Sequence, residues 1–187
     1  MKAVQDLRIA ISGKSGCGNT TVSRLLASRL GLRCINFTFR NLAQEQGLSL
    51  EEVLRRASTD DWWDREVDRR QVELARQDGG CVLGSRLAIW MLPEADLKVY
   101  LRAQPEVRAQ RIQQREGGDL ETITRFTLER DRQDRERYLR LYGIDNDVYD
   151  FADLIIDVDQ PGPEEIVEQI VKSLSQRGYG PLPAQSP

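Results

Sequence analysis

Apolar residues in this chain gather in short runs that are separated by longer segments with helical periodicity. One such run covers residues 7–12 and ends at a glycine, and others lie at 34–37, 81–83, 97–101 and 154–158. Runs this short and this continuous are typical of strands that are buried on both faces of a parallel sheet. The pattern therefore predicts five parallel strands.

Helix signals occupy the intervals between these runs. A helix with one apolar face is predicted after residues 13–18, and it ends at Gly31. A capping box over residues 49–52 begins a second helix, and a charged helix spans residues 64–77. Pro163 stands at the first turn of a last helix. Strands that alternate with helices predict one α/β domain over residues 1–174, with helices on both faces of the sheet. The Gly/Pro/Gln-rich residues 175–187 predict a disordered tail.

Composition narrows the class of protein. The 187 residues, 40% hydrophobic and 30% charged, suit a single water-soluble domain, and the net charge of 27 − 30 = −3 argues against a protein that coats nucleic acid. No apolar run is long enough to span a membrane, and no signal peptide is visible. Three cysteines without paired spacing favour a reducing compartment. We therefore expect a cytoplasmic protein with neither a membrane nor a nucleic-acid partner.

The chain contains no histidine. Serine–histidine–aspartate triads and histidine-ligated zinc are therefore excluded. The remaining chemistry must use Arg, Lys, Asp, Glu, hydroxyls and backbone amides. Phosphoryl transfer fits this set, because it depends on positioning and charge neutralisation more than on a base.

A glycine-rich loop lies between the first predicted strand and the helix that follows it. The loop matches the phosphate-binding frame G-x-x-x-x-G-K-[ST] at both glycines and at the final hydroxyl, which belongs to Thr20. Glycines let successive N–H groups turn toward an anion, the helix N-terminus adds further N–H groups, and Thr20 is placed to bind Mg²⁺. The predicted nucleotide-binding residues are Gly13, Lys14, Ser15, Gly16, Cys17, Gly18, Asn19, Thr20 and Thr21. A glycine-rich turn without a ligand is the alternative interpretation.

The lysine of this frame is missing, because Asn19 occupies its position. Asparagine donates hydrogen bonds but cannot neutralise the charge of the β- and γ-phosphates. The nearest cation is Lys14, at the second position of the loop. We therefore predict that Lys14 supplies the catalytic cation by reaching back across the loop. The alternative is that Lys14 faces solvent.

Residues 102–140 contain ten arginines, eight acids and no lysine. Arginine is the side chain suited to bidentate phosphate binding. Arg130, Asp134 and Arg137 have the i, i+4, i+7 spacing that places them on one helical face. Two arginines beside a carboxylate could hold a phosphate while the carboxylate accepts from a sugar hydroxyl. The alternative is a solvated helix with ordinary ion pairs.

With these residues in place, the chain resembles cytidylate kinases, the archaeal type more closely than the bacterial type. The resemblance extends to about Leu174. It depends on the strand–loop–helix start, on residues 39–43, 68–75, 86–91 and 142–145, and on the Arg130-x-x-x-Asp134-x-x-Arg137 signature. It implies a P-loop nucleoside monophosphate kinase fold, with a monophosphate-binding insertion near residues 37–80 and a helical lid near residues 112–145.

The resemblance also implies roles for individual residues. Arg40 and Arg86 would hold the acceptor phosphate, Asp68 and Arg70 would read the base, and Arg130 and Arg137 would be catalytic. The implied reaction uses ATP and Mg²⁺ to convert CMP, and also dCMP, into the diphosphate. Small nucleotides are the expected partners of a chain that we expect to be a monomer rather than a dimer.

Two alternatives remain open at this point. One is another acceptor on the same fold, such as AMP, UMP or a small metabolite. The other is a nucleotide-binding regulatory protein with weak turnover, which Asn19 would favour.

The chain also departs from the archaeal type at Gly84-Ser85, where that type carries an acid followed by a glycine. An acid at this position would help to orient Mg²⁺.

Overall fold

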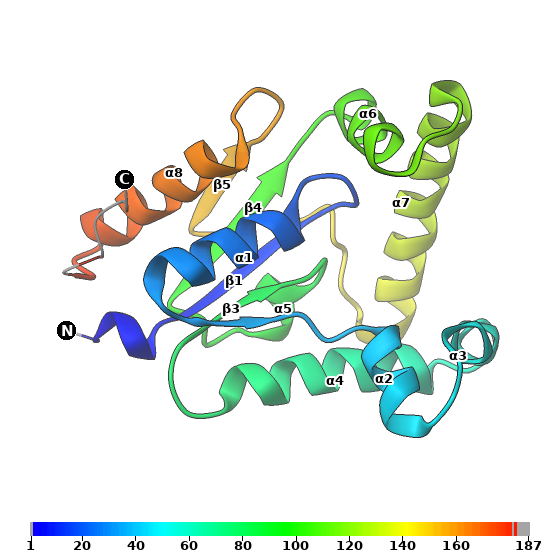
Figure 1. Ribbon diagram of the computed structural model, residues 1–187, viewed down its shortest axis with the longest axis horizontal. Coiled ribbons are helices and arrows are strands. Elements are labelled where there is room, and N and C mark those ends of the chain that lie inside the picture. The colour runs from blue at the N-terminus through cyan, green and yellow to red at the C-terminus, as the bar shows by residue number, and fades with distance from the viewer. Residues whose placement is uncertain (1, 181, 183–187) are drawn as a thin grey trace.

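Five parallel strands form the centre of the computed structural model, which describes residues 2–180 and 182. They are β1 (Arg8–Gly13), β2 (Arg33–Ile35), β3 (Cys81–Gly84), β4 (Leu97–Arg102) and β5 (Leu154–Asp157). Their order in the sheet is β2-β3-β1-β4-β5, so β1 lies between β3 and β4 and delivers the glycine-rich loop at the centre of one edge (Figure 1). The predicted five-stranded parallel sheet is confirmed.

Helices cover both faces of this sheet (Figure 1). They are α1 (Asn19–Leu30), α2 (Phe39–Gln46), α3 (Leu50–Ala57), α4 (Trp62–Arg76), α5 (Ala88–Met91), α6 (Pro105–Glu116), α7 (Leu120–Tyr142) and α8 (Pro163–Gln176), with a short 3₁₀ helix η1 (Val4–Asp6) before β1. Successive residues of β1 point to opposite faces. Ile9 and Ile11 join the core beneath α1 and α8, and Ala10 joins the core beneath α4 and α5.

The insertion α2–α4 has a hydrophobic core of its own. Phe37, Leu42, Val53, Trp63 and Val67 are all buried in a cluster that is separate from the two clusters on the sheet. Phe37 belongs to the predicted strand at residues 34–37, but β2 ends at Ile35. The apolar run therefore serves two cores, with Ile35 in the sheet and Phe37 in the insertion.

Helix ends follow local sequence chemistry. Ser49 caps α3 by accepting from the N–H of Glu52, as the capping-box pattern predicts for its serine. The Glu52 carboxylate instead pairs with Arg55 and Arg56. Pro163 occupies the first turn of α8, as predicted.

The ordered chain extends further than the predicted boundary at residue 174. Helix α8 continues to Gln176, and Tyr179 and Leu182 pack against the core beneath α1 and α8. Burying these two apolar side chains keeps this part of the expected tail on the domain. The tail residues 181 and 183–187 lie outside the described residues. Within the described part of the chain, no helix has the length and apolar character needed to cross a membrane.

Candidate nucleotide-binding site

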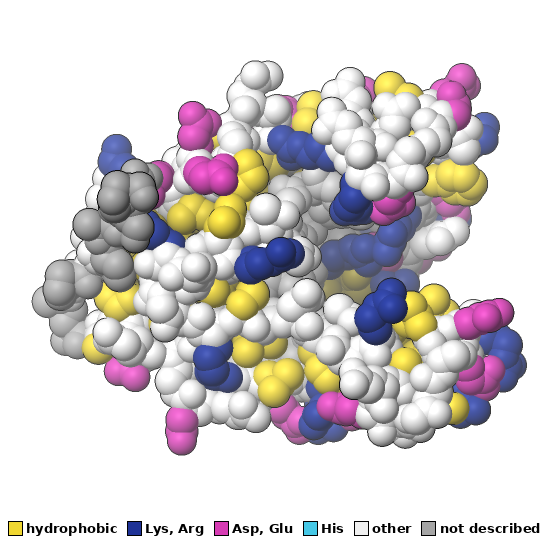
Figure 2. Space-filling model, in the orientation of Figure 1, with side chains coloured by type: hydrophobic (Ala, Val, Ile, Leu, Met, Phe, Trp, Pro, Cys, Tyr) yellow, Lys and Arg dark blue, Asp and Glu magenta, His cyan; other side chains and the backbone are white. Residues whose placement is uncertain are grey.

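A cleft of about 780 Å³ opens at the end of the sheet where β1 becomes the glycine-rich loop. Its walls come from the loop and α1, from α4 of the insertion, and from α6 and α7. Figure 2 shows the hollow, with Lys and Arg side chains on its walls. Since α6 and α7 contain most of the arginine-rich segment, the fold places that segment beside the loop (Figure 1).

The loop has the backbone geometry of an anion-binding site. Gly16 and Gly18 have φ values of 86° and 92°, a left-handed region in which other residues are strained. Gly18 is the N-cap of α1 and offers no side-chain cap, so the first N–H groups of the helix are free for an anion. Of the nine predicted nucleotide-binding residues, all except Gly13 line the cleft. The loop therefore fits the phosphates of a nucleotide.

Asn19 folds back onto the loop. Its Nδ2 donates to the carbonyl of Gly13 at 2.6 Å, and its Oδ1 is buried with no hydrogen-bond partner in the described structure. The side chain thus closes the loop on itself, although it still lines the cleft. Thr20, the predicted Mg²⁺ ligand, is exposed on the cleft wall at the start of α1.

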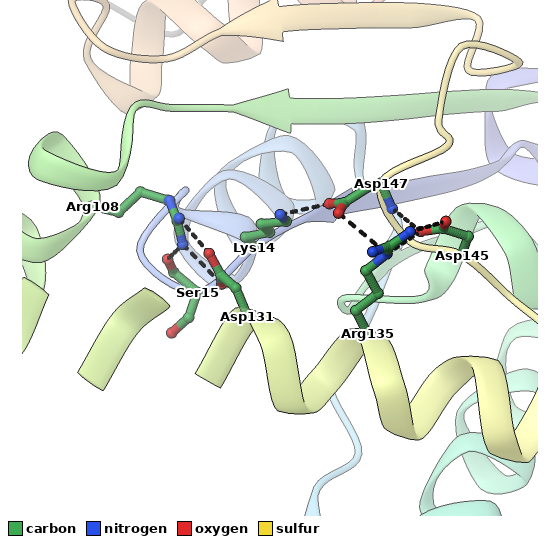
Figure 3. A network of polar contacts seen from close by, with 7 residues as sticks. All are labelled: Lys14, Ser15, Arg108, Asp131, Arg135, Asp145 and Asp147. Atoms are coloured by element: carbon green, nitrogen blue, oxygen red, sulfur yellow. Dashed lines mark hydrogen bonds and ion pairs between the residues drawn. The ribbon is translucent and has the colours of Figure 1, made fainter. Parts of the chain in front are cut away.

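Lys14 also lines the cleft, but its charge is already paired. The Lys14 ammonium lies 2.6 Å from a carboxylate oxygen of Asp147, which follows α7 (Figure 3). Asp147 in turn pairs with Arg135 at 3.4 Å, and Arg135 holds Asp145 at 2.6 Å. The predicted cation would therefore have to exchange Asp147 for a phosphate.

A group of charged side chains at the cleft comes from α7 and from the segment just after β3. Its members are Arg130, Asp134 and Arg137 of α7 and Arg86 of that segment. Arg86, just after β3, lies 3.3 Å from Asp134, and Arg137 donates to the same carboxylate at 3.0 Å. Asp134 is buried between them, so it organises the two arginines. Arg130 lines the cleft beside them, and burial together with the charge of Arg86 lowers the pKa of its guanidinium. Arg137 also pairs with Asp64 of α4 at 3.4 Å, so three arginines face two carboxylates. The net positive charge that remains is suited to an anion.

Asp68, on α4, lies at the insertion end of the cleft. The hydroxyl of Tyr142 donates to one of its oxygens at 2.6 Å. Burial is the main reason that the pKa of Asp68 is raised to about 6. A carboxylate held at the cleft wall with one oxygen occupied has its other oxygen available to a ligand.

Arg40 and Arg70 do not line the cleft. Arg40 is exposed on α2. Arg70 pairs with Glu45 at 2.7 Å, and its guanidinium carbon lies 5.4 Å from the ring centre of Phe37. Residues two apart on a helix point to different sides, so Asp68 and Arg70 cannot both face the same wall.

Several cleft residues were given no role in the site by the sequence analysis. They are Asn36, Phe37, Thr38, Phe39, Asp64, Val67, Gln71, Ser85, Arg111, Arg115, Tyr138 and residues 160–163. Asp64 and Gln71 could have been found, because they flank Asp68 at helical spacings of four and three residues. Gln71 donates its amide to the backbone carbonyl of Phe37 at 2.7 Å, which leaves the amide oxygen as an acceptor.

Residue 84 is a glycine where an acid was expected, and the packing around it explains why. A Cβ atom built at Gly84 would lie 2.1 Å from the hydroxyl oxygen of Ser23 on α1. Any side chain at this position would therefore require α1 to move.

Groups of three or more acidic or cysteine side chains that could bind a metal are absent from the described residues.

The strand–loop–helix start and the arginine-lined cleft define a P-loop kinase. Solved structures with the same fold include a shikimate kinase from Acinetobacter baumannii in complex with shikimate, with TM-score 0.63 and 19% identity over 94% of this chain and 96% of that one. A deoxyadenosine kinase from M. mycoides with bound dATP has TM-score 0.57 and 17% identity over 90% of this chain and 100% of that one. These similarities show the fold.

Sequence comparison identifies the family within this class. The cytidylate kinase-like family matches residues 8–160, and the chain belongs to that family. It is 44% identical over 175 residues to cytidylate kinase 2 of Borreliella burgdorferi, with 91% of this chain and 97% of the relative covered. It is also 44% identical over 162 residues to a cytidylate kinase of Pyrococcus horikoshii, with 86% and 84% covered. The resemblance inferred from the sequence is thereby confirmed.

Proposed function

We propose that the chain transfers the γ-phosphoryl group of ATP to CMP, and also to dCMP, giving ADP and a cytidine diphosphate. The observation that carries this proposal is that one cleft is lined by the phosphate loop, by Asp68, and by the three arginines Arg86, Arg130 and Arg137. Two nucleotides with their phosphates facing each other fit such an arrangement. Relatives at 44% identity with the name cytidylate kinase support the choice of acceptor.

The donor phosphates would lie against residues 13–21, which form the loop and the first turn of α1. The Thr20 hydroxyl would hold Mg²⁺ together with those phosphates, which suits a cation that commonly depends on substrate oxygens for its remaining ligands. When bound, Mg²⁺ neutralises phosphate charge. Lys14 would exchange Asp147 for the donor, and Asn19 would keep the loop closed by its bond to Gly13.

No general base is required for this reaction. The second pKa of a phosphate monoester is about 6, so the acceptor is largely ionised near neutral pH. The residues must instead hold two anions close together and in line. Arg86, Arg130 and Arg137 would neutralise the acceptor and the transferred group, with Asp134 orienting two of these arginines.

The base would lie against α4, where the acceptors are concentrated. Asp68 has one oxygen not engaged by Tyr142, and Gln71 presents its amide oxygen. Both would accept from the amino group of cytosine. Uracil would place a carbonyl oxygen against them, and an unpaired polar group of this kind costs about 1–3 kcal/mol. We therefore propose Gln71, rather than Arg70, as the partner of Asp68.

The remaining sequence predictions belong to the same proposal. The protein would act as a monomer in the cytoplasm, with small nucleotides as its partners. The free thiols of Cys17, Cys34 and Cys81 support a reducing compartment.

A coupled assay with ATP, Mg²⁺ and each of CMP, dCMP, UMP and AMP tests the proposal. We expect kcat/KM for CMP to exceed the values for UMP and AMP by about ten- to a hundredfold. Equal values for CMP and AMP would overturn the assignment. Binding of ATP without turnover of any acceptor would identify a regulatory nucleotide-binding protein instead.

A further inference from the structure

Arg108, on α6, lies behind the phosphate loop and forms a bidentate ion pair with Asp131 of α7 (Figure 3). Its two terminal nitrogens donate to the two oxygens of Asp131 at 3.1 and 2.6 Å. One of them also donates to the backbone carbonyl of Ser15 at 3.2 Å. The side chains of Arg108 and Asp131 are only 3% and 12% exposed, so solvent screens this pair weakly.

Arg108 contacts the loop at a place that does not line the cleft. Ser15 and Gly16 line the cleft, whereas Arg108 does not. A Cβ atom built at Gly16 would lie 2.9 Å from both the Cβ and the carbonyl oxygen of Arg108, so α6 packs directly against the back of the loop.

This contact determines where one loop N–H points. In a trans peptide the C=O and the N–H lie on opposite sides of the C–N bond. Arg108 holds the Ser15 carbonyl toward the back of the loop, so the N–H of Gly16 points toward the cleft. Within residues 2–180 and 182, nothing accepts a hydrogen bond from this N–H. A cleft-facing donor without a partner is what an anionic ligand requires.

We propose that Arg108 is a positioning residue of the phosphate loop. It fixes the orientation of the Ser15–Gly16 peptide so that the Gly16 N–H can bind the donor phosphates, and its ion pair with Asp131 couples this orientation to the position of α7. The same helix carries Arg130 and Arg137 on the acceptor side of the cleft. The Lys14–Asp147–Arg135 contacts join the loop to α7 at a second point. The proposal rests on the proposed function only in that the loop binds a nucleoside triphosphate.

A purely structural ion pair is the competing explanation, and replacing both partners separates the two. Removing one partner leaves a buried charge unpaired, whereas replacing both by apolar residues of similar volume is often neutral or stabilising. The variants are therefore Arg108→Met, Asp131→Leu and the double variant. Arg76→Met, which removes an exposed ion pair with Glu94, is the control.

Two quantities are measured for each variant: the melting temperature, and the Kd for ATP by calorimetry without any acceptor. We expect both single variants to lose melting temperature and ATP affinity. The double variant should regain most of the melting temperature while its Kd for ATP stays about tenfold above that of the unmodified protein, because one charge-assisted hydrogen bond is lost. The control should change neither quantity. A stable double variant with unchanged Kd would overturn the proposal.

The unmodified protein provides a test that does not depend on the folding of any variant. In a ¹⁵N–¹H NMR titration with ATP, the amide proton of Gly16 should move downfield as it forms a hydrogen bond to phosphate. An unchanged Gly16 resonance in a protein that binds ATP would also overturn the proposal. Neither readout involves CMP, so a failure of the proposed acceptor would be distinguishable from a failure here.

Discussion

Asp68 combines a role in the proposed base site with a cost in stability. Its carboxyl group is partly buried on α4, and its pKa is raised from the ordinary 3.8 to about 6. The folded protein therefore holds the Asp68 proton at pH values where the unfolded chain has lost it. The contribution of Asp68 to stability consequently falls as pH rises from about 4 to about 6 and stays low above that. At 1.36 kcal/mol per pKa unit, the full cost is about 3 kcal/mol.

The variant Asp68→Asn resembles the neutral acid and removes this cost. Between pH 5 and pH 7.5, linkage predicts that the stability of the variant relative to the unmodified protein rises by about 1.4 kcal/mol. For a chain of this length, the corresponding gain in relative Tm is about 3–6 °C. At pH 7.5 the variant should also lose kcat/KM for CMP by about tenfold or more, because an acceptor is replaced by a donor.

Thermal unfolding at the two pH values and a coupled assay with CMP measure both effects. A Tm difference that is equal at pH 5 and pH 7.5 would refute the reasoning, since the carboxylate would then not be ionising in a buried position. Tyr142→Phe provides an internal check. The Tyr142 hydroxyl lowers the pKa of Asp68, so its removal should move the pH dependence of stability to higher pH.

Three further predictions concern the rest of the cleft. Gln71→Leu should reduce the ratio of kcat/KM for CMP to that for UMP by about tenfold, and an unchanged ratio would exclude Gln71 from base reading. Arg130→Ala should lower kcat at least tenfold with no loss of Tm, because Arg130 has no ion pair within the described residues. Arg137→Ala should lower both kcat and Tm, because it leaves buried Asp134 with Arg86 alone and breaks the ion pair of Arg137 with Asp64. Equal Tm losses in the two variants would contradict this difference. Lys14→Ala should lower kcat/KM for ATP on the order of a hundredfold, about 2.7 kcal/mol, and adding Asn19→Lys should partly restore it. Unchanged kinetics of Lys14→Ala would show that Asp147 keeps the lysine throughout catalysis.

The fold was predictable where local pattern and tertiary role agree. Residues 9–12 are buried on both faces of a sheet, and the apolar run at residues 9–11 indicates this directly. The run at residues 34–37 was predicted as one strand, but β2 ends at Ile35, because Ile35 and Phe37 enter different cores and only the tertiary structure separates them. Helix α2 was not predicted, since its eight residues contain few apolar positions and depend on packing in the insertion.

The site divides in the same way. The loop was predictable because its chemistry lies in consecutive residues, and the helical spacing of Arg130, Asp134 and Arg137 indicated a shared face. The pairing of Lys14 with Asp147 and that of Arg108 with Asp131 join residues far apart in the chain, so no local pattern could reveal them. Helical spacing could have separated Arg70 from Asp68, because residues two apart point to different sides.

The separate core of the insertion has a consequence for how this protein family can change over evolutionary time. Asp64, Asp68 and Gln71 lie on the same helix as Trp63 and Val67, whose packing partners are within the insertion. The phosphate loop instead depends on β1 and α1, which are packed in the sheet core. Substitutions that retune recognition of the acceptor base therefore disturb a small satellite core and leave the donor machinery intact. In such an architecture, the residues proposed to recognise the acceptor base and those of the phosphate loop depend on different hydrophobic cores, so a change in one core need not unfold the other.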